Sequence, residues 1–300
     1  MKNNSDSTNT LSRKYANILG INVISTDKRE VLTRVKEFIS HNNKFYITTP
    51  NPELVLMSQK NIALKEALNA SDISIPDGIG LAQAAKLLSL KTPKNIVLKF
   101  VYTFISGIFI GGSTLVNKKW LTKDLNIIKG RELFVDLIDL ANKNRWKVYL
   151  LGGFGDESKK AAETLKKKFR DLKIKYSAGP LLNKNAESDT KVDRKIYFDS
   201  IREINLYNPH LLFVAMQNPK QELWIYKNIN KLKIGGAMTV GGSFRYVSGA
   251  SKGLPKIFDN LGLEWVWRLV TEPYRFRRIF NAFPLFPLKI WGSKLQEKMN

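Results

Sequence analysis

Short runs of β-branched and aromatic residues alternate along this chain with stretches in which apolar residues recur every three or four positions. The runs predict strands at Lys44–Thr49, Ser71–Ile75, Lys147–Leu151, Lys173–Tyr176, His210–Met216 and Ala237–Val240. The stretches between them predict helices at Lys28–Ser40, Glu53–Asn69, Ile79–Leu88, Arg131–Asn144, Glu157–Phe169, Asp193–Tyr207 and Lys220–Asn230. Strands that alternate with helices indicate an α/β fold in which a mostly parallel sheet is covered by helices on both faces.

One long segment, Thr92–Asp124, breaks this alternation. Its central part, Phe100–Gly112, contains no charged residue. It is shorter than the roughly 18 apolar residues that span a bilayer. Two interpretations are open at this point: an interfacial or re-entrant membrane segment, or a buried core helix.

The C-terminal part of the chain differs from the rest. Strand signals stop near Ala250, and basic aromatic stretches follow at Leu261–Phe280 and Ala282–Gly292. The last stretch is interrupted by proline, which rules out a spanning helix but suits an interface. We therefore expect a disordered leader (1–14), a core (15–249, with the insert at about 92–124) and a helical appendage (250–300).

Composition and charge narrow the possible functions. The chain has 300 residues, of which 43% are hydrophobic, enough to bury a core, and it has no cysteine. Disulfides, thiolate catalysis and cysteine metal sites are thereby excluded. With 49 basic and 26 acidic residues, the net charge of +23 favours an anionic partner: nucleic acid, anionic lipid or a phosphorylated substrate. A lysine-rich solvated surface explains the same charge.

Polar residues follow the first two strands of the predicted sheet. Ligands of parallel sheets bind beyond the carboxyl ends of the strands, so these positions are candidates for chemistry. Thr49 and Asn51 stand after the first strand, where either residue can also cap the next helix. Asp77 follows the second strand and is a candidate general base, with helix capping as the alternative.

Two later strand ends carry candidate nucleotide-sugar contacts. Gly152 and Gly153 form a glycine-rich turn before a helix, a place where backbone N–H groups can approach phosphate. The turn is no dinucleotide fingerprint, and no P-loop lysine follows it. The next strand ends in a dense polar group that suits sugar hydroxyls or a uracil edge: Gln217, Asn218, Lys220, Gln221 and Glu222.

Three arginines mark the C-terminal appendage. Arg268, Arg275 and Arg278 lie on one face if the helix is continuous, and guanidinium groups hold a diphosphate well. Pro273 is expected to kink or restart this helix, and a solvated basic face is the alternative. No metal site is expected, because the two histidines are far apart in sequence and no Asp-x-Asp pair follows a strand.

Together, these segments resemble the WecG/TagA/CpsF glycosyltransferase family from about Ile18 to Arg278. Five motifs stand in the family's order: TPNPE, PDGIG, YLLGG, NPKQE and GLEWVWRL-EP-R-R. The resemblance implies a Rossmann-like core, a membrane-associating C-terminal appendage, inversion at the sugar carbon and no metal or other cofactor. It also implies transfer of N-acetylmannosamine from UDP to undecaprenyl-diphosphate-linked N-acetylglucosamine, in polymers such as wall teichoic acid, at the cytoplasmic face of the membrane.

The resemblance also implies roles for individual residues. Asp77 matches the family's proposed catalytic base, and Thr49 and Asn51 match polar residues that line the same pocket. Gln221 falls in the Pro-Lys-Gln-Glu motif. The three appendage arginines, Arg268, Arg275 and Arg278, match residues implied to bind the acceptor diphosphate.

Several positions depart from the family pattern. Lys129 or Arg131 stands in for an expected arginine before a helix. Phe244-Arg245 replaces Phe-Asp, and Gly253-Leu254-Pro255 replaces Arg-Ala-Pro. These changes of charge bear on the identity of the sugar more than on the class of reaction.

Two other functions compete with glycosyl transfer. A basic, non-catalytic nucleic-acid-binding protein explains the charge but not the polar clusters at successive strand ends. A family member that binds lipid diphosphate without catalysis is disfavoured by the presence of Asp77, Thr49 and Asn51. The expected partners are therefore a UDP-sugar, a polyprenyl-diphosphate acceptor, the membrane surface and, as an open possibility, a second copy of the chain, with no nucleic acid.

Overall fold

The computed structural model describes residues 14–250, 255, 258, 261, 263–273 and 276–297. Six strands form one sheet: β3 (Phe45–Thr48), β4 (Ile73–Ser74), β5 (Lys147–Gly152), β6 (Lys173–Ser177), β7 (Leu211–Ala215) and β8 (Gly236–Thr239). Each lies where the sequence predicted a strand, within a few residues at either end. The expected leader lies outside the described residues, apart from Lys14.

All neighbouring strands of this sheet are parallel, in the order β4-β3-β8-β7-β5-β6. The sheet is therefore Rossmann-like, as predicted. From β5 the chain continues outward to β6, whereas from β7 it returns in the other direction to β8. Such a reversal between neighbouring strands opens a crevice at their carboxyl ends, which is the usual ligand position in open α/β sheets.

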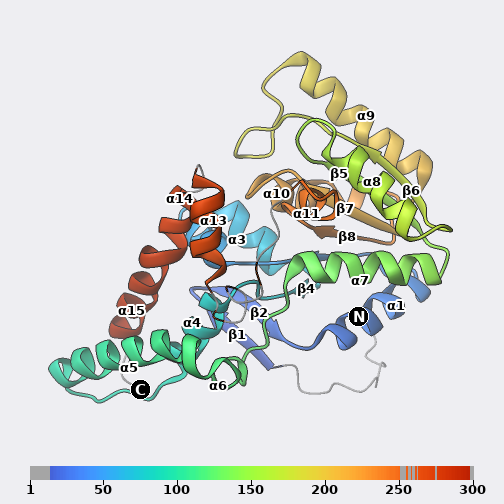
Figure 1. Ribbon diagram of the computed structural model, residues 1–300. Coiled ribbons are helices and arrows are strands. Elements are labelled where there is room, and N and C mark those ends of the chain that lie inside the picture. Colours follow the sequence, from blue (N-terminus) through green and yellow to red (C-terminus); the bar gives the residue numbers. More distant parts are fainter. Residues whose placement is uncertain are drawn as a thin grey trace, which may run out of the picture.

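Helices cover both faces of the sheet (Figure 1). One face packs against α1 (Lys28–Ser40), α7 (Gly130–Lys143) and α8 (Glu157–Lys168), and the other against α4 (Ile79–Ser89), α9 (Lys191–Tyr207) and α10 (Lys220–Asn228). The strands alternate accordingly. In β5, Val148 and Leu150 join the first core, whereas Tyr149 and Leu151 join the second. Both faces are apolar because both are buried.

Two features of the N-terminal half differ from the prediction. The helix expected at Glu53–Asn69 is two helices, α2 (Pro52–Ser58) and α3 (Ile62–Asn69), since the side chain of Asn61 accepts a hydrogen bond from Leu64 N and starts a new helix. An antiparallel hairpin, β1 (Lys14–Ile18) and β2 (Ile21–Ser25), precedes the sheet and was not predicted.

The segment that broke the predicted alternation forms one continuous helix, α5 (Ile96–Val116), followed by α6 (Lys118–Thr122). Only 22% of its most apolar window is buried, so the core-helix interpretation was wrong. α5 packs against the C-terminal α15 (Phe286–Gln296), and these two helices lie at one end of the molecule, at the lower left of Figure 1. α9 lies at the opposite end, at the upper right (Figure 1).

The described part of the appendage is helical, as predicted. α13 (Glu264–Thr271) ends just before Pro273, and α14 (Phe276–Phe280) starts after it, so the arginine segment is not one continuous helix. A π-helical turn, η3 (Asn281–Leu285), leads into α15. Three short elements complete the description: η1 (Ile229–Lys231), α6 and α11 (Ser243–Val247).

Candidate active site

Backbone hydrogen bonds join the segments that follow the carboxyl ends of β3 and β4, which we call the exits of these strands. Ile75 N donates to Thr48 O at 2.9 Å, and Asp77 N donates to Pro50 O at 2.8 Å. These two bonds place Asp77 beside the segment that carries Thr49 and Asn51, although 26 residues or more separate them in sequence. The structure therefore brings the three predicted catalytic residues together at one edge of the sheet.

Asp77 does not cap the helix that follows it. The N-cap of α4 is Gly78, whose φ of +96° is a left-handed conformation and which has no side chain to make a cap hydrogen bond. Glycine adopts this conformation without the strain that a Cβ brings. The interpretation of Asp77 as the N-cap was thus wrong, and Asp77 is a partly exposed residue at the sheet edge.

Asn51 does cap its helix, which was the alternative left open for it. Its side-chain oxygen accepts from Leu54 N at 2.9 Å at the start of α2. Thr49 has a different neighbour: a Cβ added to Gly130, the first residue of α7, would lie 3.2 Å from Thr49 Cγ2. The amino end of α7 therefore lies against the same strand exits as Asp77.

The glycine-rich turn after β5 is required by close packing against β7. Gly152 has a φ of +100°, and a Cβ there would lie 2.5 Å from Ala215 O. Gly153 N donates to the same carbonyl at 2.7 Å. Farther along the turn, Phe154 N donates to the carboxylate of Glu157 at 3.0 Å. A carboxylate of the protein therefore occupies one N–H of the turn, and nucleotide binding by Gly152 and Gly153 stays a prediction.

Gln221 connects the exits of β7 and β8. It is 2% exposed, its Nε2 donates to Asn218 Oδ1 at 3.2 Å and to Glu222 Oε1 at 2.7 Å, and its Oε1 accepts from Gly241 N at 3.1 Å. These contacts give Gln221 a structural role at the sheet edge. Lys220 and Gln217 lie on either side, partly exposed and exposed respectively.

Glu222 is a fully buried carboxylate at this edge, with 0% exposure. Burial, the largest influence, raises the pKa of Glu222 to about 7. The hydrogen bond from Gln221 and the charge of Arg278 lower its pKa, and the charge of Glu53 raises it. Its Oε2 has no hydrogen-bond partner among the residues that the structure describes.

The appendage reaches this edge through Arg278. Its Nε donates to Glu53 Oε2 at 2.8 Å, joining residues 225 positions apart, and the side chain of Glu53 is only 14% exposed. Nearby, a Cβ added to Gly80, in the first turn of α4, would lie 4.0 Å from the ring of Phe286. The C-terminal helices thus lie against the first turns of both α2 and α4, next to Asn51 and Asp77.

The other two arginines are placed differently. Arg268 makes an ion pair with Glu272 within the appendage, at 3.7 Å. Arg275 lies outside the described residues. Of the three predicted diphosphate ligands, Arg278 is therefore the one whose described contacts reach the strand exits.

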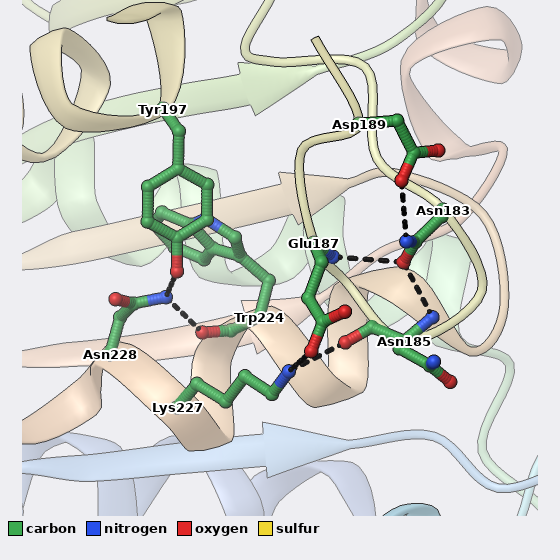
Figure 2. Close-up of polar contacts among 8 residues, drawn as sticks. All are labelled: Asn183, Asn185, Glu187, Asp189, Tyr197, Trp224, Lys227 and Asn228. Atoms are coloured by element: carbon green, nitrogen blue, oxygen red, sulfur yellow. Dashed lines mark hydrogen bonds and ion pairs between the residues drawn. The ribbon is translucent and has the colours of Figure 1, made fainter. Parts of the chain in front are cut away.

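The helix α10, which begins with Lys220, is anchored at its far end (Figure 2). Asn228 Nδ2 donates to Tyr197 Oη at 2.6 Å and to Trp224 O at 2.8 Å. Lys227 Nζ donates to Asn185 O at 2.7 Å, in the loop between β6 and α9. That loop is itself ordered by Asn183, whose side chain bonds Asn185 N, Glu187 N and Asp189. By fixing the C-terminal end of α10, these contacts help to position its polar N-terminal end.

Two positions that depart from the family pattern have defined partners. Arg245 Nε lies 3.4 Å from Glu157 Oε1, which compensates the arginine's charge beside the turn after β5. The guanidinium of Arg131 lies over the ring of Tyr246, at 5.4 Å, and Lys129 pairs with Glu132 at 3.4 Å. The third departure, at 253–255, lies outside the described residues except for Pro255.

Sequence reasoning missed the partners of these charged residues. Glu53 and Glu157 both stand in the first turn of a helix, where an acidic residue also stabilises the helix dipole. Nothing in their spacing indicated an arginine partner. Within the described ranges, no three histidine or acidic residues lie close enough to hold a metal ion.

Comparison with known proteins agrees with the resemblance seen in the motifs. The chain matches the model of the "Glycosyl transferase WecG/TagA/CpsF family" over residues 16–99 and 111–300. A Staphylococcus aureus protein (strain MRSA252), named N-acetylglucosaminyldiphosphoundecaprenol N-acetyl-beta-D-mannosaminyltransferase, is 28% identical over 283 residues, 94% of each chain. A protein of the same name from strain NCTC 8325 / PS 47 has the same identity and coverage.

Proposed function

This chain belongs to the WecG/TagA/CpsF family of glycosyltransferases, and we propose that it moves N-acetylmannosamine or a related hexose from UDP to a polyprenyl-diphosphate-linked sugar. The names of the Staphylococcus aureus relatives give both the sugar and the acceptor for those proteins. The proposal extends that substrate class to this chain and adds UDP as the carrier of the sugar.

In the proposed reaction, Asp77 is the general base. Its carboxylate takes the proton of the acceptor hydroxyl as that oxygen bonds to the anomeric carbon of the donor sugar. The bond between the anomeric carbon and the UDP oxygen breaks on the opposite side, and UDP leaves with the electron pair. Attack from the side opposite the leaving group inverts the configuration at that carbon.

The donor is proposed to lie along the carboxyl edge of the sheet. Asp77 follows β4, and Thr49 and Asn51 follow β3. After β7 come Gln217, Lys220, Gln221 and Glu222, while Gly152 ends β5 and Gly153 follows it. Three strand spacings separate β3 from β5, which is about 14 Å. This span suits a nucleotide-sugar with its sugar at Asp77 and its nucleotide toward β7 and β5.

The charge that develops on UDP needs neutralisation. Lys220 and the N–H groups at the helix starts supply it in this proposal, without an obligatory metal. Glu222 and Gln221 are buried, so their proposed contribution is to fix the shape of the loop that contacts the donor.

The acceptor is proposed to enter on the side of the appendage. Arg278 uses Nε to bond Glu53, and its two terminal nitrogen atoms are the proposed diphosphate ligands, together with Arg268 and Arg275. A lipid-linked acceptor requires the protein to work at a membrane surface, and we propose the cytoplasmic face as a peripheral protein.

One observation carries the proposal: backbone hydrogen bonds join the Asp77 loop to the exit of β3, next to the helix that Arg278 contacts. The test is to incubate wild type and Asp77→Asn with a panel of UDP-sugars and a lipid-diphosphate-sugar acceptor, and to identify products by mass spectrometry. Loss of a general base lowers the rate by about 10²–10⁴-fold.

The matched control for this test is Asp171→Asn, the same chemical change at an exposed position between α8 and β6. It should keep wild-type turnover. If Asp77→Asn turns over within a few-fold of wild type while folding and donor binding are normal, Asp77 is not the base.

A further inference from the structure

α5 has its polar residues turned inward and its apolar residues turned outward. Its buried residues form one stripe, of which four of five are polar: Lys99, Thr103, Ile110, Ser113 and Thr114. The opposite face exposes large apolar side chains, among them Val101 (47%), Ile105 (60%) and Ile108 (64%). A helix on the surface of a soluble protein has the reverse arrangement.

The inward stripe is held by specific polar contacts. Gln83, on α4, donates to Thr114 Oγ1 at 2.6 Å. From α15, Trp291 Nε1 donates to Thr103 Oγ1 at 3.1 Å, while Lys99 Nζ bonds Glu297 O at 2.9 Å. These bonds fix the rotation of α5 about its own axis. Its apolar face is turned outward because its polar face is bonded to α4 and to the C-terminal segment.

The outward face fits hydrocarbon better than water. An exposed apolar surface of this size marks a membrane or protein contact in soluble proteins. α5 also contains Gly107, Gly111 and Gly112, and a Cβ added at any of them would meet nothing within 4 Å. Close packing therefore does not require these glycines, which weaken a helix in water but are common in membrane helices.

The charges around α5 point to an anionic surface. Between Gly78 and Lys123 the sequence has no acidic residue, and its basic residues are Lys86, Lys91, Lys94, Lys99, Lys118, Lys119 and Lys123. Exposed lysines stand just before the helix, at Lys91 and Lys94, and just after it, at Lys119 and Lys123. Lysines at both ends of an apolar helix face suit anionic headgroups beside an apolar interior.

From these observations we infer that the outward face of α5 inserts into the headgroup and upper acyl region of an anionic phospholipid bilayer, with the helix axis parallel to the membrane. The helix has 21 residues, long enough to span, but its inward stripe contacts α4, α6 and α15. Crossing the bilayer would take these neighbours into the hydrocarbon as well, so the helix lies in the interface.

The central part of this surface lies outside what the family match covers. The family model matches residues 16–99 and 111–300 and leaves 100–110 unmatched, which is the central part of α5. The inference concerns a lipid contact and does not depend on which sugar is transferred. Vesicle binding can be measured without donor or acceptor, so its failure and a failure of the proposed reaction are distinguishable.

The first test replaces three outward residues with a neutral polar residue that favours helix: Val101→Gln, Ile105→Gln and Ile108→Gln. The matched control is Val192→Gln, Phe198→Gln and Leu206→Gln, on α9, whose side chains are 69%, 63% and 80% exposed. Both sets keep the net charge. Binding is measured by flotation with vesicles of equimolar phosphatidylglycerol and phosphatidylcholine, in low and in high salt.

In high salt, which screens the lysines, the α5 variant should lose at least about a hundredfold in partition coefficient, because burial of one large apolar side chain alone is worth about tenfold or more. The α9 control should bind as wild type does. Equal binding of all three proteins would overturn the inference. So would a wild-type dimer that the α5 variant abolishes without a change in flotation, because α5 would then be a contact between two copies.

The second test needs no disruptive substitution. Because the chain has no cysteine, Ile108→Cys and Leu206→Cys each provide a single site for a polarity-sensitive dye. Nitroxide-labelled lipids should quench the dye at position 108, most strongly with the nitroxide near the headgroups, and should not quench it at position 206. Equal quenching at both positions, or maximal quenching from the bilayer centre, would contradict an interfacial α5.

Discussion

Glu222→Gln should make the stability of this protein less sensitive to pH. Burial raises the pKa of Glu222 from its ordinary value of 4.5 to about 7, so the folded state holds a proton that the unfolded state releases. The contribution of Glu222 to folding stability is therefore fully present below pH 4.5 and is lost as pH rises through 7. At about 1.4 kcal/mol for each pH unit, the loss is about 3 kcal/mol by pH 8.

Glutamine is neutral at every pH and keeps the oxygen that accepts from Gln221. Relative to wild type, Glu222→Gln should gain up to about 3 kcal/mol of unfolding free energy between pH 4 and pH 8. The assay is urea unfolding followed by circular dichroism across this range. Taking the difference in unfolding free energy between variant and wild type at each pH cancels the contributions of the other titrating groups.

The control for this experiment is Glu163→Gln, on the exposed side of α8, which makes the same change of charge at the surface. Its difference from wild type should stay nearly constant with pH. A constant difference for Glu222→Gln as well would refute the reasoning, because it would mean that water or a counter-ion reaches this carboxylate in the folded protein.

Two further predictions concern the proposed reaction, and a third concerns an ion pair beside the turn after β5. Chelators should leave turnover largely unchanged, since basic side chains and helix N–H groups are proposed to meet the diphosphate charge; strict dependence on magnesium or manganese would contradict this. Replacing Arg268, Arg275 and Arg278 together with lysine should keep most vesicle binding but lower acceptor turnover, because an ammonium cannot form the bidentate contact of a guanidinium. Normal turnover would make them a charge patch only. Finally, Arg245→Met and Glu157→Met should show a coupling of about 0.5–1 kcal/mol in a double-mutant unfolding cycle, limited by solvent screening at their 3.4 Å contact; additive effects would show that the contact is worth nothing.

The sheet and most helices could be predicted because their signals are local. Short runs of β-branched and aromatic residues placed every strand of the sheet, and α1 has the predicted bounds of Lys28–Ser40. The β1–β2 hairpin was missed for a physical reason. Its turn begins at Leu19, with a φ of +52°, and leucine is not a turn signal. The hairpin is held by Asn69, the last residue of α3, whose side chain accepts from Asn22 N and donates to Gly20 O.

The residues of the candidate site likewise include some that local signals could place and some whose roles depend on distant contacts. Parallel strands meet at one edge, so polar residues after successive strands could be expected to gather there, and Asp77 and Thr49 do so. The roles of Asn51 and Gln221 were harder to foresee, because a side chain that caps a helix or bridges two loops has the same residue type as one that contacts a sugar. The pair of Arg278 and Glu53 joins positions 225 residues apart, and no local pattern encodes such a contact.

α15 connects α5, the helix that we propose contacts the membrane, to the proposed acceptor side of the site. At its start, Phe286 lies against Gly80, three residues after Asp77, and farther along the ring of Trp291 lies 5.0 Å from that of Phe100 on α5. Five residues of helix separate these two contacts, a rise of about 8 Å. A polyprenyl acceptor keeps its tail in the bilayer and its diphosphate at the surface. Because α15 contacts both α5 and the first turn of α4, which follows Asp77, we expect the proposed base to lie within reach of that surface. The nucleotide is proposed to lie toward β7 and β5, away from this end of the sheet. Donor and acceptor can then enter from different sides, and UDP can leave while the lipid product is still held at the membrane.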